Sequence, residues 1–288
     1  MNYSEFKEAI VKTLKDKVEA RGLSVELKAI VKTNDCVQDG LMLMDENTLA
    51  APTIYLEDFY EFYEEGADVS SIADKIIEIH DKNVDLCPIS NFDIENFELS
   101  KNKITFKLVN TAINQIYLKD LVHIDYLDLS ILFDCTVVLP DGQVMSTRIT
   151  EEIMKIWHTN KETLLEIAKE NTKRILGLFL QEAGEILQDR KENHGPKLYI
   201  LSNRTGHAGA VNIFLPGVLK DLAEELQDDL YIIPSSIHEV LLVPVSGVIS
   251  RENIDEMVRD VNKNVLEPKD ILSNHSYYYR RLEDKIAL

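Results

Sequence analysis

Six polar side chains between positions 203 and 239 are the residues of this 288-residue sequence whose types and spacing could do chemistry. The segment Ser235-Ser236-Ile237-His238-Glu239 places serine, histidine and a carboxylate within a few positions of one another. A serine hydrolase uses these groups as nucleophile, general base and orienting acid, within hydrogen-bond reach. Ser236 and His238 are therefore candidate catalytic residues.

The same spacing also has a simpler explanation. Neither serine lies in a G-x-S-x-G nucleophile elbow. If residues 238–245 form a strand, His238 and Glu239 point to opposite faces and cannot act as base and orienter. A turn after Pro234, whose serines bond nearby backbone groups, accounts for these residues without catalysis.

Asn203 and His207 lie in a second polar segment, which ends at Gly209. A phosphate-binding loop leads into a helix as G-x-x-x-x-G-K-S/T or G-x-G-x-x-G, and RTGHAG (204–209) fits neither pattern. We expect a hairpin loop instead. Neighbouring hairpins in one sheet would bring Asn203 and His207 close to Ser236 and His238.

No metal or cofactor site is expected from the remaining histidines and cysteines. The residue four positions after His238 is Leu242, so no zinc-binding histidine pair is formed, and the other histidines are scattered. Cys36, Cys87 and Cys135 are also far apart, which favours a reducing, cytoplasmic location. The N-terminus has the pattern of an amphipathic helix instead of a signal peptide, and no apolar run reaches the roughly 18 residues of a membrane span.

Negative charge is concentrated in one part of the chain. The formal net charge is −19, and the segment Asp45 to Glu98 has 15 acidic and two basic residues, or −13. Nucleic acids and anionic membranes bind basic surfaces, so we expect neither as a partner. A solvated acidic surface explains the segment, and a basic protein partner is the alternative.

Aromatic residues accompany this charge in TIYLEDFYEFYEEG (53–66), where one helix face cannot bury all of them. Either Tyr60 or Phe62 should then be exposed. A second, basic aromatic segment includes Tyr277, Tyr278 and Arg280. Because aromatic residues dominate interface energetics, we predict these five as contact residues for a protein partner or a second copy of the chain. Burial of the first cluster between helix and sheet is the alternative.

Pairs of predicted strands followed by helices recur along the sequence. The expected strands are 25–32, 40–44, 127–139, 144–149, 198–202, 210–215, 230–234 and 238–245, and the expected helices are 3–20, 57–66, 69–82, 150–157, 161–175, 217–227 and 251–264. Short hairpins pair antiparallel, so we predict an α+β fold whose helices cover one face of each sheet. Duplication and common hairpin–helix packing both remain open as explanations of the repetition.

Residues 92–122 are predicted to form a helical connector between two lobes. The expected N-terminal lobe is 1–120, with the acidic surface and the connector, and the C-terminal lobe is 121–288. The polar segment 188–197 is predicted to be an exposed loop.

Several segments resemble clostridial and related Firmicutes proteins, of the family catalogued as domain of unknown function 5688. They include TIYLEDFYEFYEEG (53–66), KITFKLVN (103–110), LDLSILF (127–133), LLEIAKENTKRI (164–175), YIIPSSIHEVLLVP (231–244) and ILSNHSYYY (271–279). The resemblance implies a bacterial, cytoplasmic and self-contained protein. It implies no activity, cofactor or catalytic residue.

These observations favour a non-catalytic binding or protein-interaction module. The alternative is a hydrolase-like small-molecule enzyme with a site between the 203–209 loop and the 234–239 turn. The two functions differ in whether Asn203, His207, Ser236 and His238 line one cavity.

Overall fold

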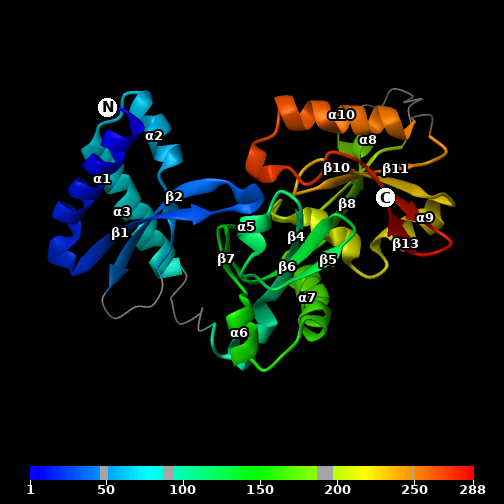
Figure 1. The fold of residues 1–288 in the computed structure, drawn as a ribbon, viewed down its shortest axis with the longest axis horizontal. Helices are drawn as coiled ribbons and strands as arrows, with labels where there is room; N and C mark the ends of the chain where they lie inside the picture. Colours follow the sequence, from blue (N-terminus) through cyan, green and yellow to red (C-terminus); the bar gives the residue numbers. More distant parts are fainter. Residues whose placement is uncertain (46–50, 87–93, 187–196, 248–249) are drawn as a thin grey trace. The chain divides into compact units, whose positions relative to one another are not determined.

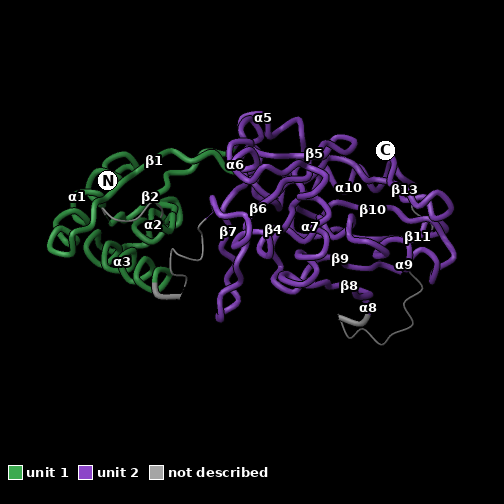
Figure 2. Tube along the Cα trace, turned by 90° about the horizontal axis from the view of Figure 1, so that it is seen from below, with its two compact units in different colours: residues 1–32, 36–93 green, residues 33–35, 94–288 purple. Residues whose placement is uncertain are grey.

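A computed structural model of the chain describes residues 1–45, 51–86, 94–186, 197–247 and 250–288. Cys87, residues 188–196 of the predicted loop, residues 92–93 of the predicted connector and parts of the acidic segment lie outside this description. The chain divides into two compact units, coloured separately in Figure 2. Unit 1 comprises residues 1–32 and 36–93, and unit 2 comprises residues 33–35 and 94–288.

The described residues of unit 1 form a three-stranded antiparallel sheet in the order β1-β2-β3, together with three α-helices (Figure 1). Its elements are α1 (Tyr3–Val18), the 3-10 turn η1 (Glu19–Arg21), β1 (Leu23–Val31), β2 (Val37–Asp45), β3 (Ile54–Tyr55), α2 (Glu57–Glu64) and α3 (Val69–Leu86).

Local sequence explains where α1 begins and which face it buries. The Asn2 side chain accepts a hydrogen bond from the Glu5 amide, and the Glu5 carboxylate accepts one from the Asn2 amide, which is a capping box. The buried residues recur every four positions and therefore share one helix face. They are Phe6, Ile10, Leu14 and Val18, and they join Leu41, Leu43 and Ile76 in the core of unit 1.

In the part of unit 2 that the structure describes, the strands form two antiparallel sheets. The four-stranded sheet has the order β4-β6-β5, and β7 also pairs with β6. The six-stranded sheet has the order β13-β12-β10-β11-β9-β8. The strands are β4 (Ile104–Asn110), β5 (His123–Tyr126), β6 (Leu129–Val138), β7 (Val144–Arg148), β8 (Phe179–Glu182), β9 (Tyr199–Ser202), β10 (Leu230–Pro234), β11 (Val240–Pro244), β12 (Tyr277–Arg280) and β13 (Lys285–Ala287).

Helices and short 3-10 segments connect these strands. They are η2 (Thr33–Asp35), α4 (Phe97–Ser100), η4 (Lys101–Lys103), α5 (Gln115–Leu118), α6 (Glu151–Ile156), α7 (Lys161–Ile175), α8 (Ala183–Ile186), η5 (Gly209–Phe214), α9 (Val218–Leu226), α10 (Arg251–Asn264) and η6 (Pro268–Asp270). The predicted helices 161–175 and 251–264 are confirmed with the same bounds.

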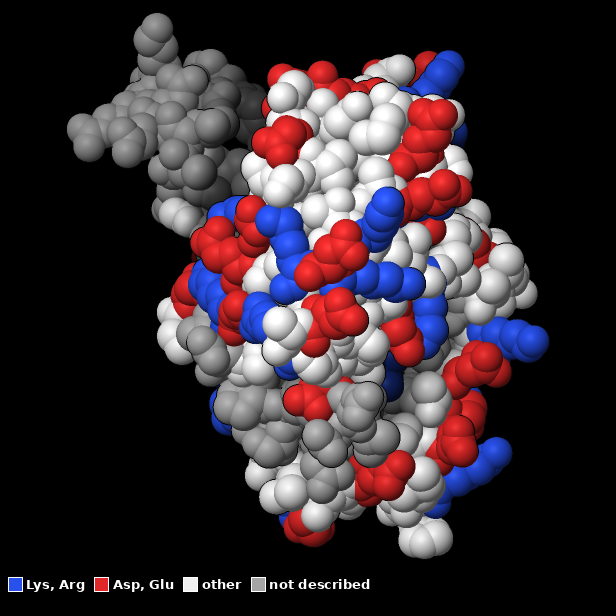
Figure 3. Space-filling view, turned by 90° about the vertical axis from the view of Figure 1, so that its left-hand side faces the viewer, with Lys and Arg blue, Asp and Glu red and all other residues white. Residues whose placement is uncertain are grey.

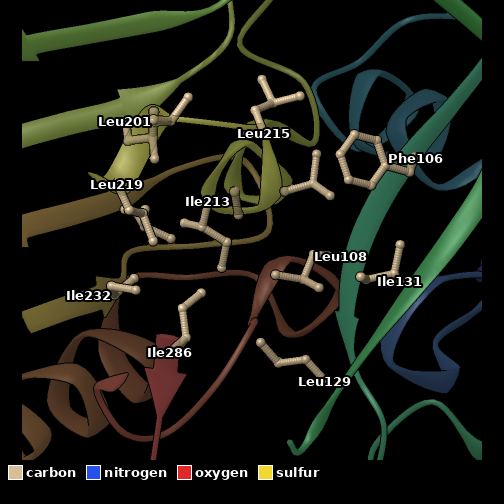
Figure 4. Close-up of a cluster of buried hydrophobic side chains, with 14 of the residues drawn as sticks. Phe106, Leu108, Leu129, Ile131, Leu201, Ile213, Leu215, Leu219, Ile232 and Ile286 are labelled. Atoms are coloured by element: carbon tan, nitrogen blue, oxygen red, sulfur yellow. The ribbon is translucent and has the colours of Figure 1, made fainter. Parts of the chain in front are cut away.

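A single apolar cluster joins the two sheets of unit 2. Figure 4 shows Phe106, Leu108, Leu129 and Ile131 of β4 and β6 on one side, facing side chains of the second sheet, η5 and α9. Ile213 of η5 lies between them, and Leu164 and Ala168 of α7 belong to the same cluster. Because alternate residues of a strand point to opposite faces, Lys107 and Asp134 point away from this core.

The α+β prediction with antiparallel hairpins is confirmed, but two local predictions are wrong. Residues 104–110, within the predicted helical connector, form β4, which pairs with β6 along its length. The predicted strand 210–215 is the 3-10 helix η5.

The expected lobe boundary near residue 120 falls inside unit 2, since the two compact units separate between residues 93 and 94. The physical reason is the pairing of β4 with β6, which ties residues 104–110 to the C-terminal part of the chain.

Cys135 of β6 is expected to resist thiol reagents in the folded protein. It is 2% exposed, and burial together with the nearby Asp134 carboxylate raises its pKa to about 12. The thiolate is the reactive form of cysteine. Because the Cys135 pKa lies about four units above pH 8, only about one Cys135 side chain in ten thousand is a thiolate at that pH. Iodoacetamide labelling followed by peptide mass spectrometry should modify Cys135 only after unfolding. Rapid labelling of native Cys135 would contradict this prediction.

Candidate functional site

The structure brings Asn203, His207, Ser236 and His238 together at one end of the six-stranded sheet. Strand β9 pairs with β11, so the loop after Ser202 lies beside the turn before Val240. The rings of His207 and His238 are 5.4 Å apart between centroids. The Ser202 hydroxyl donates a hydrogen bond to the His238 carbonyl at 2.8 Å, which joins the two segments.

Hydrogen bonds occupy both ring nitrogens of His238. The Ala208 amide donates to Nδ1 at 3.0 Å, and Nε2 lies 3.3 Å from the Asp270 carboxylate. Because an amide can only donate, Nδ1 must be unprotonated, and the ring proton of neutral His238 is on Nε2, facing Asp270. The lone pair that a general base needs is therefore already used by the backbone.

The two serines are placed for backbone and carboxylate contacts instead of nucleophilic attack. The Ser236 hydroxyl accepts a hydrogen bond from the His238 amide at 3.0 Å and is not bonded to the imidazole. The Ser235 hydroxyl donates to the Glu239 carboxylate at 3.0 Å. A serine nucleophile requires a basic partner aligned with its hydroxyl, and this turn does not supply one.

Asn203 and Gly209 hold the 203–209 loop in its conformation. The Asn203 side chain donates to the His207 carbonyl at 2.6 Å and accepts hydrogen bonds from the amide and hydroxyl of Thr205. A Cβ atom at Gly209 would meet the Ser202 hydroxyl, the His238 carbonyl at 2.6 Å and the Asn203 amide at 2.7 Å. Convergence of the four candidate residues thus follows from close backbone packing.

Sequence reasoning missed Asp270, which orients His238 from η6. The two residues are 32 positions apart, and η6 is held by a hydrogen bond from the Ile237 amide to the Asp270 carbonyl. It also missed the pair of His275 and Asp128, whose Nε2 and Oδ2 atoms are 3.0 Å apart. No local sequence signal joins either pair.

The predicted basic aromatic patch is only partly on the surface. Tyr277 is 1% exposed, and its hydroxyl donates to Asp128 at 2.8 Å, so Tyr277 is a core residue and not a contact residue. Tyr278 is half-buried and donates to Asp229; burial and that carboxylate raise the Tyr278 pKa to about 12. Arg280 is exposed and pairs with Glu283. Strand alternation explains why neighbouring tyrosines differ in burial.

A buried ion pair lies on the polar face of the four-stranded sheet. Lys107 Nζ is 2.7 Å from Asp134 Oδ2, and the two side chains are 17% and 8% exposed. Burial alone lowers the Lys107 pKa, but the Asp134 carboxylate outweighs it, and the net effect raises that pKa. The same ammonium lies 5.6 Å from the centroid of the Tyr117 ring.

The predicted acidic aromatic segment places Phe62 on the surface and Tyr60 in a cluster. Phe62 is 55% exposed, whereas Tyr60 packs against Tyr3, Phe6 and Tyr63 and donates to the Met1 carbonyl. Helical spacing puts Phe62 on one face with three exposed carboxylates. We call this face the α2 stripe, and it consists of Asp58, Glu61, Phe62 and Glu65.

Basic residues offset the acidic charge on another helix of unit 1. Lys17 and Arg21 form ion pairs with Asp74 and Asp81, the partners on α3. In Figure 3, Lys and Arg side chains lie among Asp and Glu side chains on the face shown. In contrast, the carboxylates of the α2 stripe have no ion-pair partner among the described residues.

His80 of α3 is buried, and its burial is expected to make unit 1 sensitive to acid. It is 6% exposed, its Nδ1 lacks a hydrogen-bond partner among the described residues, and burial lowers its pKa. A histidine with a lowered folded pKa binds fewer protons in the folded state. Unit 1 should therefore lose stability as the pH falls below the unfolded value of about 6.5.

Hydrogen exchange of α1 and α3 amides at about pH 7.5 and about pH 5.5 measures this loss, after correction for intrinsic rates. His80→Leu should reduce the difference, and His158→Asn, at an exposed position of unit 2, should preserve it. Equal pH dependence in the His80→Leu variant would show that other groups cause the effect.

Two hollows lie away from the histidine cluster. One, of about 580 Å³, lies between α1 and β1 in unit 1. The other, of about 440 Å³, is lined by Asp229, Arg251, Tyr278 and Arg280 in unit 2. Within the described ranges, no three His, Cys, Asp or Glu side chains are grouped to hold a metal ion. No helix of those ranges is both long and apolar enough to cross a membrane.

Comparison with known proteins identifies the family of the chain. Neither the curated proteins nor the solved structures gave a match. Residues 3–281 match a family described as "Family of unknown function (DUF5688)". This match spans both units and all the candidate residues above, so the chain belongs to that family.

Proposed function

We propose that this chain is a non-catalytic, cytoplasmic protein-interaction module whose recognition surface is the α2 stripe. The observation that carries the proposal is Phe62, which is 55% exposed among three carboxylates that have no ion-pair partner in the described part of unit 1. Burying an exposed phenylalanine contributes about 1.5–3 kcal/mol, which makes it a suitable anchor for a partner.

The chemistry of the stripe selects a basic partner with apolar side chains. Residues 57–65 contain five carboxylates and no lysine or arginine. An apolar side chain of the partner would cover the Phe62 ring, while lysines or arginines beside it would meet Asp58, Glu61 and Glu65. Such charges mainly set specificity and the rate of association. Nucleic acids and anionic lipid are disfavoured because they repel the same carboxylates.

Fluorescence anisotropy with a labelled peptide of alternating lysine and leucine residues tests the proposal. We expect binding that weakens as the salt rises from about 0.1 M to about 1 M, because the Debye length falls from about 10 Å to about 3 Å. Phe62→Ala should weaken binding about tenfold, which corresponds to the loss of about 1.4 kcal/mol at an anchor residue.

A matched variant separates the stripe from net charge. Glu61→Gln/Glu65→Gln should weaken binding, whereas Glu252→Gln/Glu256→Gln, which removes the same charge from exposed positions of α10, should not. Equal losses in both variants would show that the peptide senses only total charge. Binding of labelled duplex DNA at about 0.15 M salt would also contradict the proposal.

A hydrolase-like small-molecule enzyme is the alternative function, and the convergence of Asn203, His207, Ser236 and His238 favours it. Against it, Ala208 occupies the basic nitrogen of His238, and Ser236 bonds the backbone instead of the ring. Labelling of Ser235 or Ser236 by a fluorophosphonate probe would support the enzyme over the interaction module.

A further inference from the structure

We propose that the partner of the α2 stripe is a second copy of this chain, which receives the stripe in its α1–β1 groove. This inference rests on the proposed function of the stripe and names its partner. The groove is the hollow of about 580 Å³ in unit 1, and Val11 and Leu27 supply its apolar surface. Lys12 and Lys15 line it, are exposed, and have no ion-pair partner among the described residues.

The stripe and the groove are complementary in charge and in the order of their residues. A helix rises 1.5 Å per residue, so Glu61 and Glu65 are separated by about 6 Å along α2 and Lys12 and Lys15 by about 4.5 Å along α1. Phe62 lies between the two glutamates in sequence. When Phe62 covers Val11 and Leu27, both glutamates come within reach of the flexible lysine side chains.

The remaining charges of the groove limit how the stripe can bind. Glu8 and Asp16 lie one helical turn before and after Lys12 and repel the carboxylates of the stripe. Lys7 already bonds Asp39 at 2.8 Å. The attraction is therefore confined to Lys12 and Lys15, which makes the interface weak and sensitive to salt.

The stripe and the groove of one copy do not bind each other. Phe62 is exposed in the single chain, so the stripe of a copy does not occupy that copy's groove. Stripe and groove are different surfaces and each copy offers one of each, so two copies can join reciprocally about a two-fold axis, or successive copies can join head to tail. Self-association should accordingly increase with protein concentration and decrease with salt.

Sedimentation velocity over a range of protein and salt concentrations measures this association. The stripe variant Glu61→Gln/Phe62→Ala and the groove variant Lys12→Gln/Lys15→Gln should each be monomeric. Their equimolar mixture should form a complex of two chains and nothing larger, because one intact stripe and one intact groove remain. The control Glu252→Gln/Glu256→Gln should associate as the unmodified protein does, and circular dichroism confirms that each variant is folded.

Each other outcome overturns the inference in a distinguishable way. A monomeric protein that still binds the basic peptide through Phe62 would leave the proposed function in place and exclude the second copy as partner. Association that persists in both variants, or a mixture that forms no complex, would place any self-contact elsewhere. If the unmodified protein neither binds the basic peptide nor associates, the proposed function is overturned as well.

Discussion

Replacing Asp134 with alanine is expected to destabilise unit 2 by about 3–5 kcal/mol. The variant leaves the Lys107 ammonium without the carboxylate that lies 2.7 Å away, at a site where the lysine side chain is only 17% exposed. Asp134 also lies in β6 between β4 and β7, so water cannot easily take the place of its carboxylate beside the Lys107 ammonium. Urea unfolding measures the effect through Trp157, the one tryptophan of the chain, which is buried in unit 2.

Two further variants separate the buried charge from the loss of a side chain. Lys107→Met/Asp134→Val removes both charges and should recover most of the stability, since apolar residues of similar size often replace a buried ion pair without loss. Asp120→Ala, at an exposed position of unit 2, should change the free energy of unfolding by less than about 0.5 kcal/mol. A cost below about 1 kcal/mol for Asp134→Ala would show that water reaches the pair.

Gly209→Ala should destabilise unit 2 by about 3 kcal/mol, at the upper end of the range for overpacking. The new Cβ would lie 2.6 Å from the His238 carbonyl and 2.7 Å from the Asn203 amide, and both are backbone atoms that cannot rotate away. The loop must then separate from the turn, which breaks the Ser202–His238 and Ala208–His238 hydrogen bonds. Urea unfolding followed by Trp157 fluorescence gives the loss.

Gly184→Ala is the matched control, because its Cβ would meet no atom closer than 4.0 Å. In α8 the added methyl group should be neutral or stabilising by up to about 1 kcal/mol. If Gly209→Ala is equally harmless, the contact between the 203–209 loop and the His238 turn is looser than the structure shows.

Amphipathic helices with local end signals were predicted well. The Ser250 hydroxyl accepts a hydrogen bond from Asn253 at the start of α10, as its position before an apolar helical pattern indicates. For α7, Asn160 supplies the cap, and Leu164 and Ala168 lie on the buried face. Caps and helical periodicity depend on residues within four positions of one another, so the sequence contains all the information they need.

Strand β4 lacks the local pattern that identifies a strand. Its residues Ile104, Thr105 and Phe106 are all buried, because one face contacts the apolar core and the other contacts a polar layer that includes Lys107 and Asp134. A strand buried on both faces loses the alternation of apolar and polar residues that identifies a strand. The strand prediction for residues 210–215 is wrong for a related reason, since a short apolar run fits a buried 3-10 helix as well as a strand.

The closeness of the four candidate residues was predicted from the sequence, but their hydrogen bonds were not. Residues 203–239 contain the histidines and serines, and the closeness of two short segments in sequence favours their being neighbours in one sheet. The hydrogen-bond partners of the two His238 ring nitrogens cannot be inferred in this way, because Asp270 and Ala208 lie in segments about 30 positions away on either side. Register and loop packing bring these atoms together, and the free energy of many distant contacts determines both.

Charge and local periodicity thus belong to the sequence: the acidic α2 helix, the capped helices and the antiparallel hairpins all follow from neighbouring residues. The exposure of each side chain and its hydrogen-bond and ion-pair partners are decided by the tertiary structure. Tyr277 and Phe62 are both aromatic residues beside charged ones, yet one is 1% exposed and the other 55%. The difference arises because a side chain is buried only where another element packs against it, and that element is distant in sequence.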